Sequence, residues 1–215
     1  MNTGKFNLYQ YQTYIFDFDG VIADSNAIKE KAINKSVDNF TEKETRQKFL
    51  EFFIANNGIP REIKVNKFFS KNISEKILSE YSKILKKELR KVNLIKGVKD
   101  FIESLEDKDL YILSGGDKRE ITDILEEKKI KNYFKKVLAG PEKKDKNFLE
   151  INKKGKIIFF GDSAIDYQLA KENNLDFIFL YGATSMKNWE NELEFNSTSQ
   201  RMALSFKDFI ELKLC

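Results

Sequence analysis

Tyr14-Ile15-Phe16-Asp17-Phe18-Asp19-Gly20-Val21 is the stretch that decides the fold, because it joins an apolar run directly to two acidic residues. The run has the composition of a buried strand, and strand alternation places Asp17 and Asp19 on one side of the backbone while Phe18 points away. In open parallel sheets, ligands bind outside the carboxyl ends of the strands. Two close carboxylates are costly unless a cation lies between them or one of them is protonated. The stretch therefore predicts a chemical site at the end of a buried strand.

Four further apolar runs with strand character follow, and helical patterns separate most of them. The runs are Leu110 to Leu113, Lys136 to Leu138, Lys156 to Phe160 and Asp176 to Leu180. An amphipathic helix is predicted before the first of them, from the spacing of Val98, Phe101, Ile102 and Leu105. Because strands and helices alternate from residue 97 onward, we expect an α/β fold with a doubly wound, Rossmann-like, mostly parallel sheet.

Residues 24–95 interrupt this alternation and have helical character throughout, with Ile73, Ile77 and Tyr81 in the clearest apolar stripe. A segment of this length is too long for a loop, so it predicts an inserted helical subdomain. Asp24 and Ser25 are candidate caps of its first helix. Residues 1–23 and 96–215 would then form the core domain. We also expect a last helix near the carboxyl terminus, with the capping-box spacing of Ser205 and Asp208.

The composition excludes several classes of chemistry. The 215 residues include no histidine, which excludes imidazole-based acid–base catalysis, histidine-dependent triads and histidine-ligated zinc. Cys215 is the only cysteine, so the chain has neither a disulfide framework nor a thiolate metal site, as is typical of a reducing cytoplasm. Carboxylates and lysines are left to move protons or bind a metal.

Charge and hydropathy point to a cytoplasmic protein with a small-molecule partner. Lysine and arginine total 38 and aspartate and glutamate 34, a net charge of +4, and the lysines are scattered among glutamates rather than gathered into one strip. We therefore expect no nucleic-acid partner. No apolar run approaches the length of a membrane span, and the first 13 residues lack a secretory pattern. We expect a monomer or a homodimer that does not bind membranes.

Polar residues follow two of the other predicted strands. Ser114-Gly115-Gly116 comes directly after the second, and its hydroxyl and two backbone amides could hold a tetrahedral anion. Gly161-Asp162-Ser163 and Asp166 come directly after the fourth. The loop Ala139-Gly140-Pro141-Glu142-Lys143-Lys144 lies between them and carries lysines that could neutralise charge. Since the carboxyl ends of parallel strands meet at one edge of a sheet, these groups are expected around one crevice.

In this order, Asp17-Phe18-Asp19-Gly20-Val21, Ser114, Lys144 and the stretch from Gly161 to Asp166 resemble the four motifs of the haloacid dehalogenase-like hydrolases. The resemblance covers about Tyr14 to Gly182 and places residues 24–95 where that superfamily carries a cap. It points to the branch that includes phosphoglycolate-phosphatase-like and beta-phosphoglucomutase-like members. Each motif alone is weak, but all four in order behind predicted strands are specific.

The resemblance implies a catalytic role for each motif. Asp17 would be the nucleophile that forms an aspartyl-phosphate, and Asp19 would act as acid and then as base. Ser114, Lys144 and the amides near Gly115 and Gly116 would hold the phosphoryl oxygens. The lysine could also be Lys143 or Lys146, although the resemblance favours Lys144, because related loops of the Gly-x-Pro-x-x-Lys type end at that position.

A Mg²⁺ cofactor is implied as well, since hard oxygen ligands suit that ion. Its ligands would be Asp17, the backbone carbonyl of Asp19, and Asp162. Asp166 would bind a metal-bound water or orient the lysine.

The implied activity is Mg²⁺-dependent hydrolysis of a small phosphorylated metabolite, such as a sugar phosphate or a phosphoglycolate-like acid. In the insertion, Asn56-Asn57-Gly58-Ile59-Pro60-Arg61 resembles a His-Gly-x-x-Arg cap loop with Asn57 in place of histidine, which makes Arg61 a candidate substrate contact. An ordinary interhelical turn with a surface Arg61 is the alternative. A sugar phosphomutase of the beta-phosphoglucomutase type and a non-catalytic binding or regulatory protein are the alternative functions.

Overall fold

The computed structural model describes residues 7–193 and 200–211 and contains a six-stranded sheet in the order β3-β2-β1-β4-β5-β6. Every neighbouring pair of strands is parallel. The strands are β1 (Thr13–Phe16), β2 (Asp109–Asp117), β3 (Phe134–Gly140), β4 (Ile157–Gly161), β5 (Asp176–Leu180) and β6 (Gln200–Ala203). The chain reverses its winding direction between β1 and β4, which is where doubly wound sheets bind ligands. The predicted α/β fold is therefore confirmed. Cys215 lies outside the described residues.

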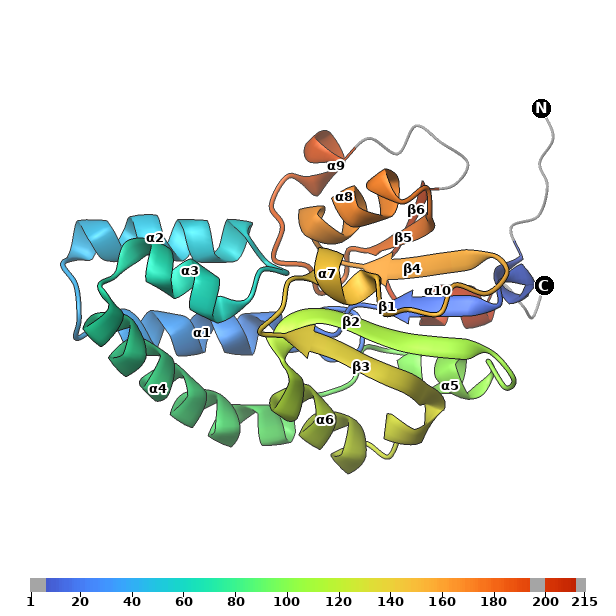
Figure 1. Ribbon diagram of the computed structural model, residues 1–215, viewed down its shortest axis with the longest axis horizontal. Helices are drawn as coiled ribbons and strands as arrows, with labels where there is room; N and C mark the ends of the chain where they lie inside the picture. Colours follow the sequence, from blue (N-terminus) through green and yellow to red (C-terminus); the bar gives the residue numbers. More distant parts are fainter. Residues whose placement is uncertain (1–6, 194–199, 212–215) are drawn as a thin grey trace.

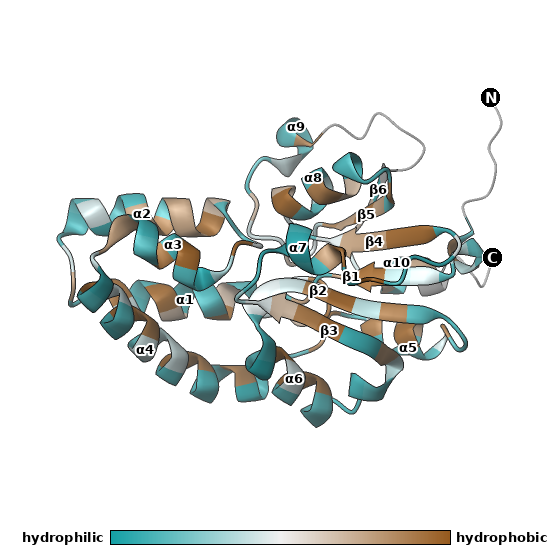
Figure 2. Ribbon diagram, in the orientation of Figure 1, coloured by the Kyte–Doolittle hydropathy of each residue, from teal (hydrophilic) through white to brown (hydrophobic). Residues whose placement is uncertain are grey.

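The sheet is buried on both faces by alternating aromatic and aliphatic side chains. Tyr14 and Phe16 of β1 belong to the larger apolar cluster, whereas Ile15 between them belongs to the smaller cluster on the opposite face. Phe16 stacks on Phe160 of the neighbouring strand, with ring centroids 5.0 Å apart. Strand β4 is accordingly among the most hydrophobic segments in Figure 2. A strand covered on both faces reads as a continuous apolar run, which is how β1 and β4 were found.

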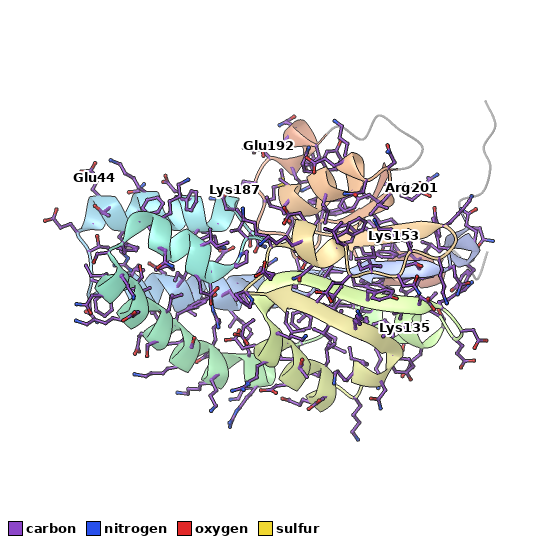
Figure 3. All side chains as sticks on the ribbon, in the orientation of Figure 1. Glu44, Lys135, Lys153, Lys187, Glu192 and Arg201 are labelled. Carbon is purple, nitrogen blue, oxygen red and sulfur yellow. The ribbon has the colours of Figure 1, made fainter. Side chains whose placement is uncertain are left out.

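Helices cover both faces (Figure 1). The larger cluster includes apolar residues of α5 (Val98–Glu103) and α6 (Lys118–Glu127), and α10 (Lys207–Glu211) packs on it through Phe209. The smaller cluster lies under α7 (Lys144–Phe148), α8 (Ala164–Glu172) and α9 (Trp189–Glu192). Charged side chains such as Glu44 and Glu192 extend outward from the ribbon (Figure 3). Among the described residues, no helix combines the length and the apolar character that crossing a bilayer requires.

Four of the five α-helices between β1 and β2 stand beside the carboxyl ends of the strands (Figure 1). They are α1 (Asn26–Val37), α2 (Lys43–Ala55), α3 (Arg61–Phe68) and α4 (Lys71–Glu88). The two connecting segments pair with each other, because the Asp24 amide donates to the Asn93 carbonyl at 2.9 Å and the Ile95 amide to the Ile22 carbonyl at 2.9 Å. We refer to residues 24–95 as the cap.

The interior of the cap is largely aromatic. Phe49 is fully buried, and its ring lies 5.6 Å from Phe53, 5.4 Å from Phe68 and 5.0 Å from Phe69 between centroids. Edge-on and tilted contacts at these distances stabilise a small core beyond the simple burial of apolar area. The cap therefore has a core of its own, which connects to the larger cluster of the sheet.

Two elements differ from the sequence-based expectation. Strand β6 was not predicted, because Gln200-Arg201-Met202-Ala203 carries no apolar run. It is an edge strand that pairs only with β5, and an edge strand needs little hydrophobic character. Strand β2 runs on to Asp117 with a register shift against β3 after Leu113, so Ser114-Gly115-Gly116 lies within the last part of the strand and not behind it.

The cap loop of residues 56–60 touches the core at Gly115. A Cβ on Gly115 would lie 2.1 Å from the carbonyl oxygen of Gly58 and 2.6 Å from its carbonyl carbon. Both are backbone atoms, so only glycine permits this approach. The contact holds the cap loop against the end of β2.

We predict that Gly115→Ala separates the cap loop from the core, because the added methyl group overlaps backbone atoms that cannot rotate away. Amide hydrogen exchange in residues 56–60 should become faster, while exchange in β1 and β4 stays as in the wild type. Equal exchange of the cap loop in both proteins would show that the contact does not hold the loop.

Candidate active site

The ends of three neighbouring strands bring the predicted site residues together. The Asp17 amide donates to the Phe160 carbonyl at 2.9 Å, which fixes the end of β1 against β4. Asp162 follows β4 directly, and Asp166 lies in the first turn of α8. Ser114 lies near the end of β2, and Lys144 is the first residue of α7. All five side chains are buried, although four of them carry ionisable groups.

Lys144 joins two of the carboxylates. Its Nζ lies 2.9 Å from Asp17 Oδ1 and 2.6 Å from Asp166 Oδ1. Lys143 is exposed, and so is Lys146, which pairs with Glu142 at 3.0 Å. Of the three candidate lysines, Lys144 is the one that the structure brings to Asp17. Burial disfavours an ammonium, but Asp166 and Asp17 outweigh that effect and raise the pKa of Lys144.

Asp17, Asp162 and Asp166 form a buried carboxylate cluster whose ligand oxygens all lie within 4.8 Å of one another. Burial and the neighbouring carboxylates raise the pKa of Asp17 and of Asp162. When all three are ionised, three negative charges against the one positive charge of Lys144 leave a net charge of −2. A divalent cation would neutralise this charge.

Asp162 has an oxygen free for such a cation. Its Oδ2 accepts a hydrogen bond from Asn26 Nδ2 at 2.6 Å, whereas Oδ1 is buried and has no hydrogen-bond partner among residues 7–193 and 200–211. An orphaned carboxylate oxygen is costly in a protein interior unless a ligand completes it. Gly20 lets the carboxylate approach this closely, because a Cβ there would lie 2.1 Å from Asp162 Oδ2. The donor set thus fits a hard divalent metal such as Mg²⁺.

Asp166 holds Lys144 and is itself held by Ser163. Ser163 Oγ donates to Asp166 Oδ2 at 2.5 Å and accepts from the Asp166 amide at 3.3 Å, so it caps α8. Because Oδ1 of Asp166 is 2.6 Å from Lys144, the contacts of Asp166 are those of a residue that orients the lysine.

The side chain of Asp19 points to the cap and not to the carboxylate cluster. Its Oδ2 pairs with Lys29 Nζ at 2.6 Å, and its Oδ1 accepts from Ser25 Oγ at 2.5 Å. Burial alone would raise the pKa of Asp19, but Lys29 and Ser25 hold it below its ordinary value. Ser25 precedes α1 as expected of a cap, but its hydroxyl binds Asp19 in place of a helix amide, and Asp24 is exposed.

Ser114 and the two glycines after it line the same cavity as Asp17 and Asp19. Ser114 Oγ accepts from the Gly116 amide at 3.0 Å, and a Cβ on Gly116 would lie 3.4 Å from Asp19 Oδ2. The end of β2 therefore passes close to both acidic residues.

The cavity extends from these strand ends to the cap. Its cap side includes Lys29, Phe53, Arg61, Lys64 and Tyr81. Arg61 lines the cavity, but its guanidinium pairs with Glu120 at 2.8 Å and Asp117 at 3.3 Å, both on the core. It therefore links the cap to the core.

Sequence reasoning missed four polar residues at the site. Lys29 and Lys64 line the cavity, and Asn26 links Asp162 to the cap loop, since it donates to Asp162 and accepts from Asn57 Nδ2 at 3.1 Å. Ser25 was taken only as a helix cap. Closeness in the sequence could have pointed to three of them, since Ser25, Asn26 and Lys29 follow Asp17 within 12 positions. Lys64 gave no signal, because a lysine in a helix is usually solvated.

We predict that Lys64→Met raises the melting temperature near pH 6.5 by about 2–4 °C, the shift that about 1 kcal/mol produces in a chain of this size. Burial, followed by the charge of Lys29, lowers the pKa of Lys64 from 10.5 to about 7, so the folded state resists the charged form. The penalty is fully present below about pH 7 and fades as the pH approaches 10.5, where both states are neutral.

Thermal unfolding of both proteins at pH 6.5 and pH 10 checks this prediction. A difference in melting temperature that does not shrink with pH would show that the Lys64 ammonium is not disfavoured by folding.

Comparisons with solved structures support the fold. A predicted phosphatase from Clostridium acetobutylicum is 21% identical with a TM-score of 0.70, covering 95% of this chain and 98% of its own. A predicted phosphoglycolate phosphatase from Haemophilus somnus is 16% identical with a TM-score of 0.70, covering 96% and 100%. A magnesium-bound haloacid dehalogenase hydrolase from Bacillus subtilis is 16% identical with a TM-score of 0.65, covering 96% and 100%. At these identities the similarity establishes the fold alone.

Sequence comparison identifies the family. No curated protein matches the chain. The profile of the haloacid dehalogenase-like hydrolases matches residues 14–180, which include the carboxylate cluster, Lys144, Ser114 and the whole cap. This protein is therefore a member of the haloacid dehalogenase-like hydrolase family.

Proposed function

We propose that this protein is a Mg²⁺-dependent phosphomonoesterase that hydrolyses a small phosphorylated metabolite through an aspartyl-phosphate on Asp17. The observation that carries the proposal is the contact of Lys144 with Asp17 at 2.9 Å, within a cluster of three carboxylates that this one ammonium neutralises only in part. A nucleophile with a fixed positive charge and a metal-binding donor set beside it is what phosphoryl transfer requires.

Asp17 is the nucleophile in this proposal. Lys144 binds one carboxylate oxygen, which orients the side chain for in-line attack on phosphorus. A bond forms between a carboxylate oxygen of Asp17 and phosphorus, and the bond from phosphorus to the leaving alkoxide oxygen breaks. In the second step water attacks the phosphorus of the aspartyl-phosphate and regenerates Asp17. Lys144 and the amide of Gly115 would stabilise the charge that develops on the phosphoryl oxygens, and Ser114 would donate a hydrogen bond to one of them.

Asp19 handles the proton in both steps. It would protonate the leaving alkoxide in the first step and accept a proton from water in the second. Its contacts with Lys29 and Ser25 favour the ionised form, which suits the second step. Protonation for the first step requires that Lys29 release Asp19, and a bound phosphoryl group would compete for this lysine. Substrate binding and the acid role of Asp19 are thereby coupled.

The metal ligands in this proposal are Asp17, Asp162 and the backbone carbonyl of Asp19. When bound there, Mg²⁺ would neutralise charge on the transferring phosphoryl group. Asp162 is held by Asn26, and its free Oδ1 supplies the ligand atom. Asp166 keeps Lys144 charged and in position.

The cavity favours a small substrate. It is lined on one side by the strand ends and on the other by the cap, and the cap loop contacts Gly115. A pocket enclosed between the strand ends and the cap leaves no room for a folded macromolecule. Exclusion of water by such a cap would strengthen the electrostatic contacts of the phosphoryl group.

Asp17→Asn should abolish phosphate release, by at least about 1,000-fold, because the amide is a poor nucleophile and no longer pairs with Lys144 as a charge. Phosphate release from a panel of phosphorylated sugars, acids and nucleotides measures the effect. Asp100→Asn is a matched control, since Asp100 is exposed on α5. Equal loss in both variants, or activity retained in Asp17→Asn, would refute the role of Asp17.

Removal of Mg²⁺ with a chelator should abolish turnover, and added Mg²⁺ should raise the melting temperature of the wild type, because the ion binds only the folded cluster. Asp162→Asn should raise the Mg²⁺ concentration needed for half-maximal stabilisation by about tenfold or more, since it removes one charge from the ligand set. Unchanged Mg²⁺ affinity in this variant would exclude Asp162 as a ligand.

A further inference from the structure

Three cationic side chains line the cap side of the cavity in the described part of the chain, namely Lys29, Arg61 and Lys64. A cation that faces a cavity can serve the protein's own charge balance or bind a ligand. The acidic neighbours of each cation decide which of these two roles it has.

Two of the three cations are neutralised within the protein. Lys29 pairs with Asp19 at 2.6 Å. Arg61 pairs with Glu120 at 2.8 Å and Asp117 at 3.3 Å. Burial alone would lower the pKa of Arg61, but the charge of Glu120 outweighs burial and the pKa is raised. Both have fixed acidic partners, so neither is left for a ligand without breaking an ion pair.

Lys64 differs from both. It is 4% exposed, and within residues 7–193 and 200–211 no carboxylate lies within ion-pair distance of its Nζ. Its one hydrogen-bond partner is the Phe53 carbonyl at 3.1 Å, and its Nζ lies 3.6 Å from the centroid of the Phe53 ring. An ammonium has three donors, so two remain without a partner in the described chain.

Such a group is unfavourable in the free protein. A buried ammonium without a counterion is costly, and contact with one aromatic ring and one carbonyl offsets only part of that cost. The low pKa of Lys64, caused by burial and then by Lys29, agrees with this. If Lys64 served only to cap the end of α2, its hydrogen bond to the Phe53 carbonyl would be sufficient. That role would not explain why the charge faces the same cavity as Asp17.

We propose that Lys64 binds a second anionic group of the substrate, so that the enzyme prefers phosphomonoesters that also carry a carboxylate or a second phosphate. The inference rests on the proposed function and names the substrate class of that same site. The phosphoryl group that reacts lies at Asp17, and the second oxyanion supplies the counterion that Lys64 lacks within the protein.

Matched substrate pairs test the proposal. 3-Phosphoglycerate and glycerol 3-phosphate differ by a carboxylate, and fructose 1,6-bisphosphate and fructose 6-phosphate differ by a phosphate. In at least one pair, we expect wild-type kcat/KM to be higher for the compound with the additional anionic group than for its partner. The pair that shows this preference identifies the group as a carboxylate or a phosphate. Lys64→Met should lower kcat/KM for the preferred member by about 10- to 100-fold, mainly through KM, and for its partner by less than about threefold.

Lys67→Met is the matched control, because Lys67 lies on the same helix and over an aromatic ring, Phe52 at 4.4 Å, but is exposed and does not line the cavity. It should leave both members of each pair unchanged. Lys64→Gln is a second variant, to be used if Lys64→Met does not fold by circular dichroism. Equal losses for both members of a pair, or none, would overturn the proposal.

Binding separates this inference from the proposed function. Calorimetric titration of Asp17→Asn and of Asp17→Asn/Lys64→Met with the same four compounds needs no turnover. If the wild type hydrolyses none of them, the proposed function fails for these compounds. Tighter binding of the preferred member that disappears with Lys64 would still support the anionic subsite, and equal binding of both members in both variants would refute it.

Discussion

The ion pairs of Lys144 with Asp17 and Asp166 are the interaction on which the site depends. Three carboxylates gather at the ends of β1 and β4 because the parallel sheet reverses its winding there, and burial makes that gathering costly. One ammonium at 2.9 Å and 2.6 Å offsets part of the cost, and a net charge of −2 remains when all three carboxylates are ionised. This residual charge is what a divalent cation and a phosphoryl group can use together. The proposed binding of Mg²⁺ and of a phosphoryl group thus follows from negative charge that Lys144 does not fully neutralise.

Polar and backbone contacts connect the cap to this centre. Asn57 of the cap loop donates to Asn26, and Asn26 donates to Asp162. Gly58 packs on Gly115, and Arg61 reaches Glu120 on the core. The cap loop, Asp162 and the end of β2 are therefore held together by neighbouring contacts. Lys29, the ion-pair partner of Asp19, lies on α1 of the cap. A substrate that contacts the cap could therefore change the environment of Asp19.

Most of the fold and the centre of the site could be predicted from the sequence, because buried strands and their acidic ends leave strong local patterns. Asp17 and Asp162 are found this way, whereas Lys144 was favoured over Lys143 and Lys146 only by its resemblance to related loops. Strand β6 was not predicted, since an edge strand needs no apolar run. Site residues on the helices of the cap were harder to predict from the sequence. Lys64 and Lys29 look like solvated lysines until packing places them against the cavity. The sequence left Arg61 open as a substrate contact or a surface residue and gave no sign of its ion pair with Glu120. Tertiary pairing of charges leaves no periodic signal.

A covalent intermediate is the most direct test of the account. Asp19→Asn should slow hydrolysis of the aspartyl-phosphate, and an aryl phosphate such as 4-nitrophenyl phosphate has a leaving group that needs no proton from Asp19. Acid-quenched Asp19→Asn protein, mixed with this compound and Mg²⁺, should carry one phosphoryl group on the peptide that contains Asp17 by mass spectrometry. Adding Asp17→Asn should remove it. Release of the aryl group with no phosphorylated peptide, or with the phosphoryl group on another residue, would contradict the central role of Asp17.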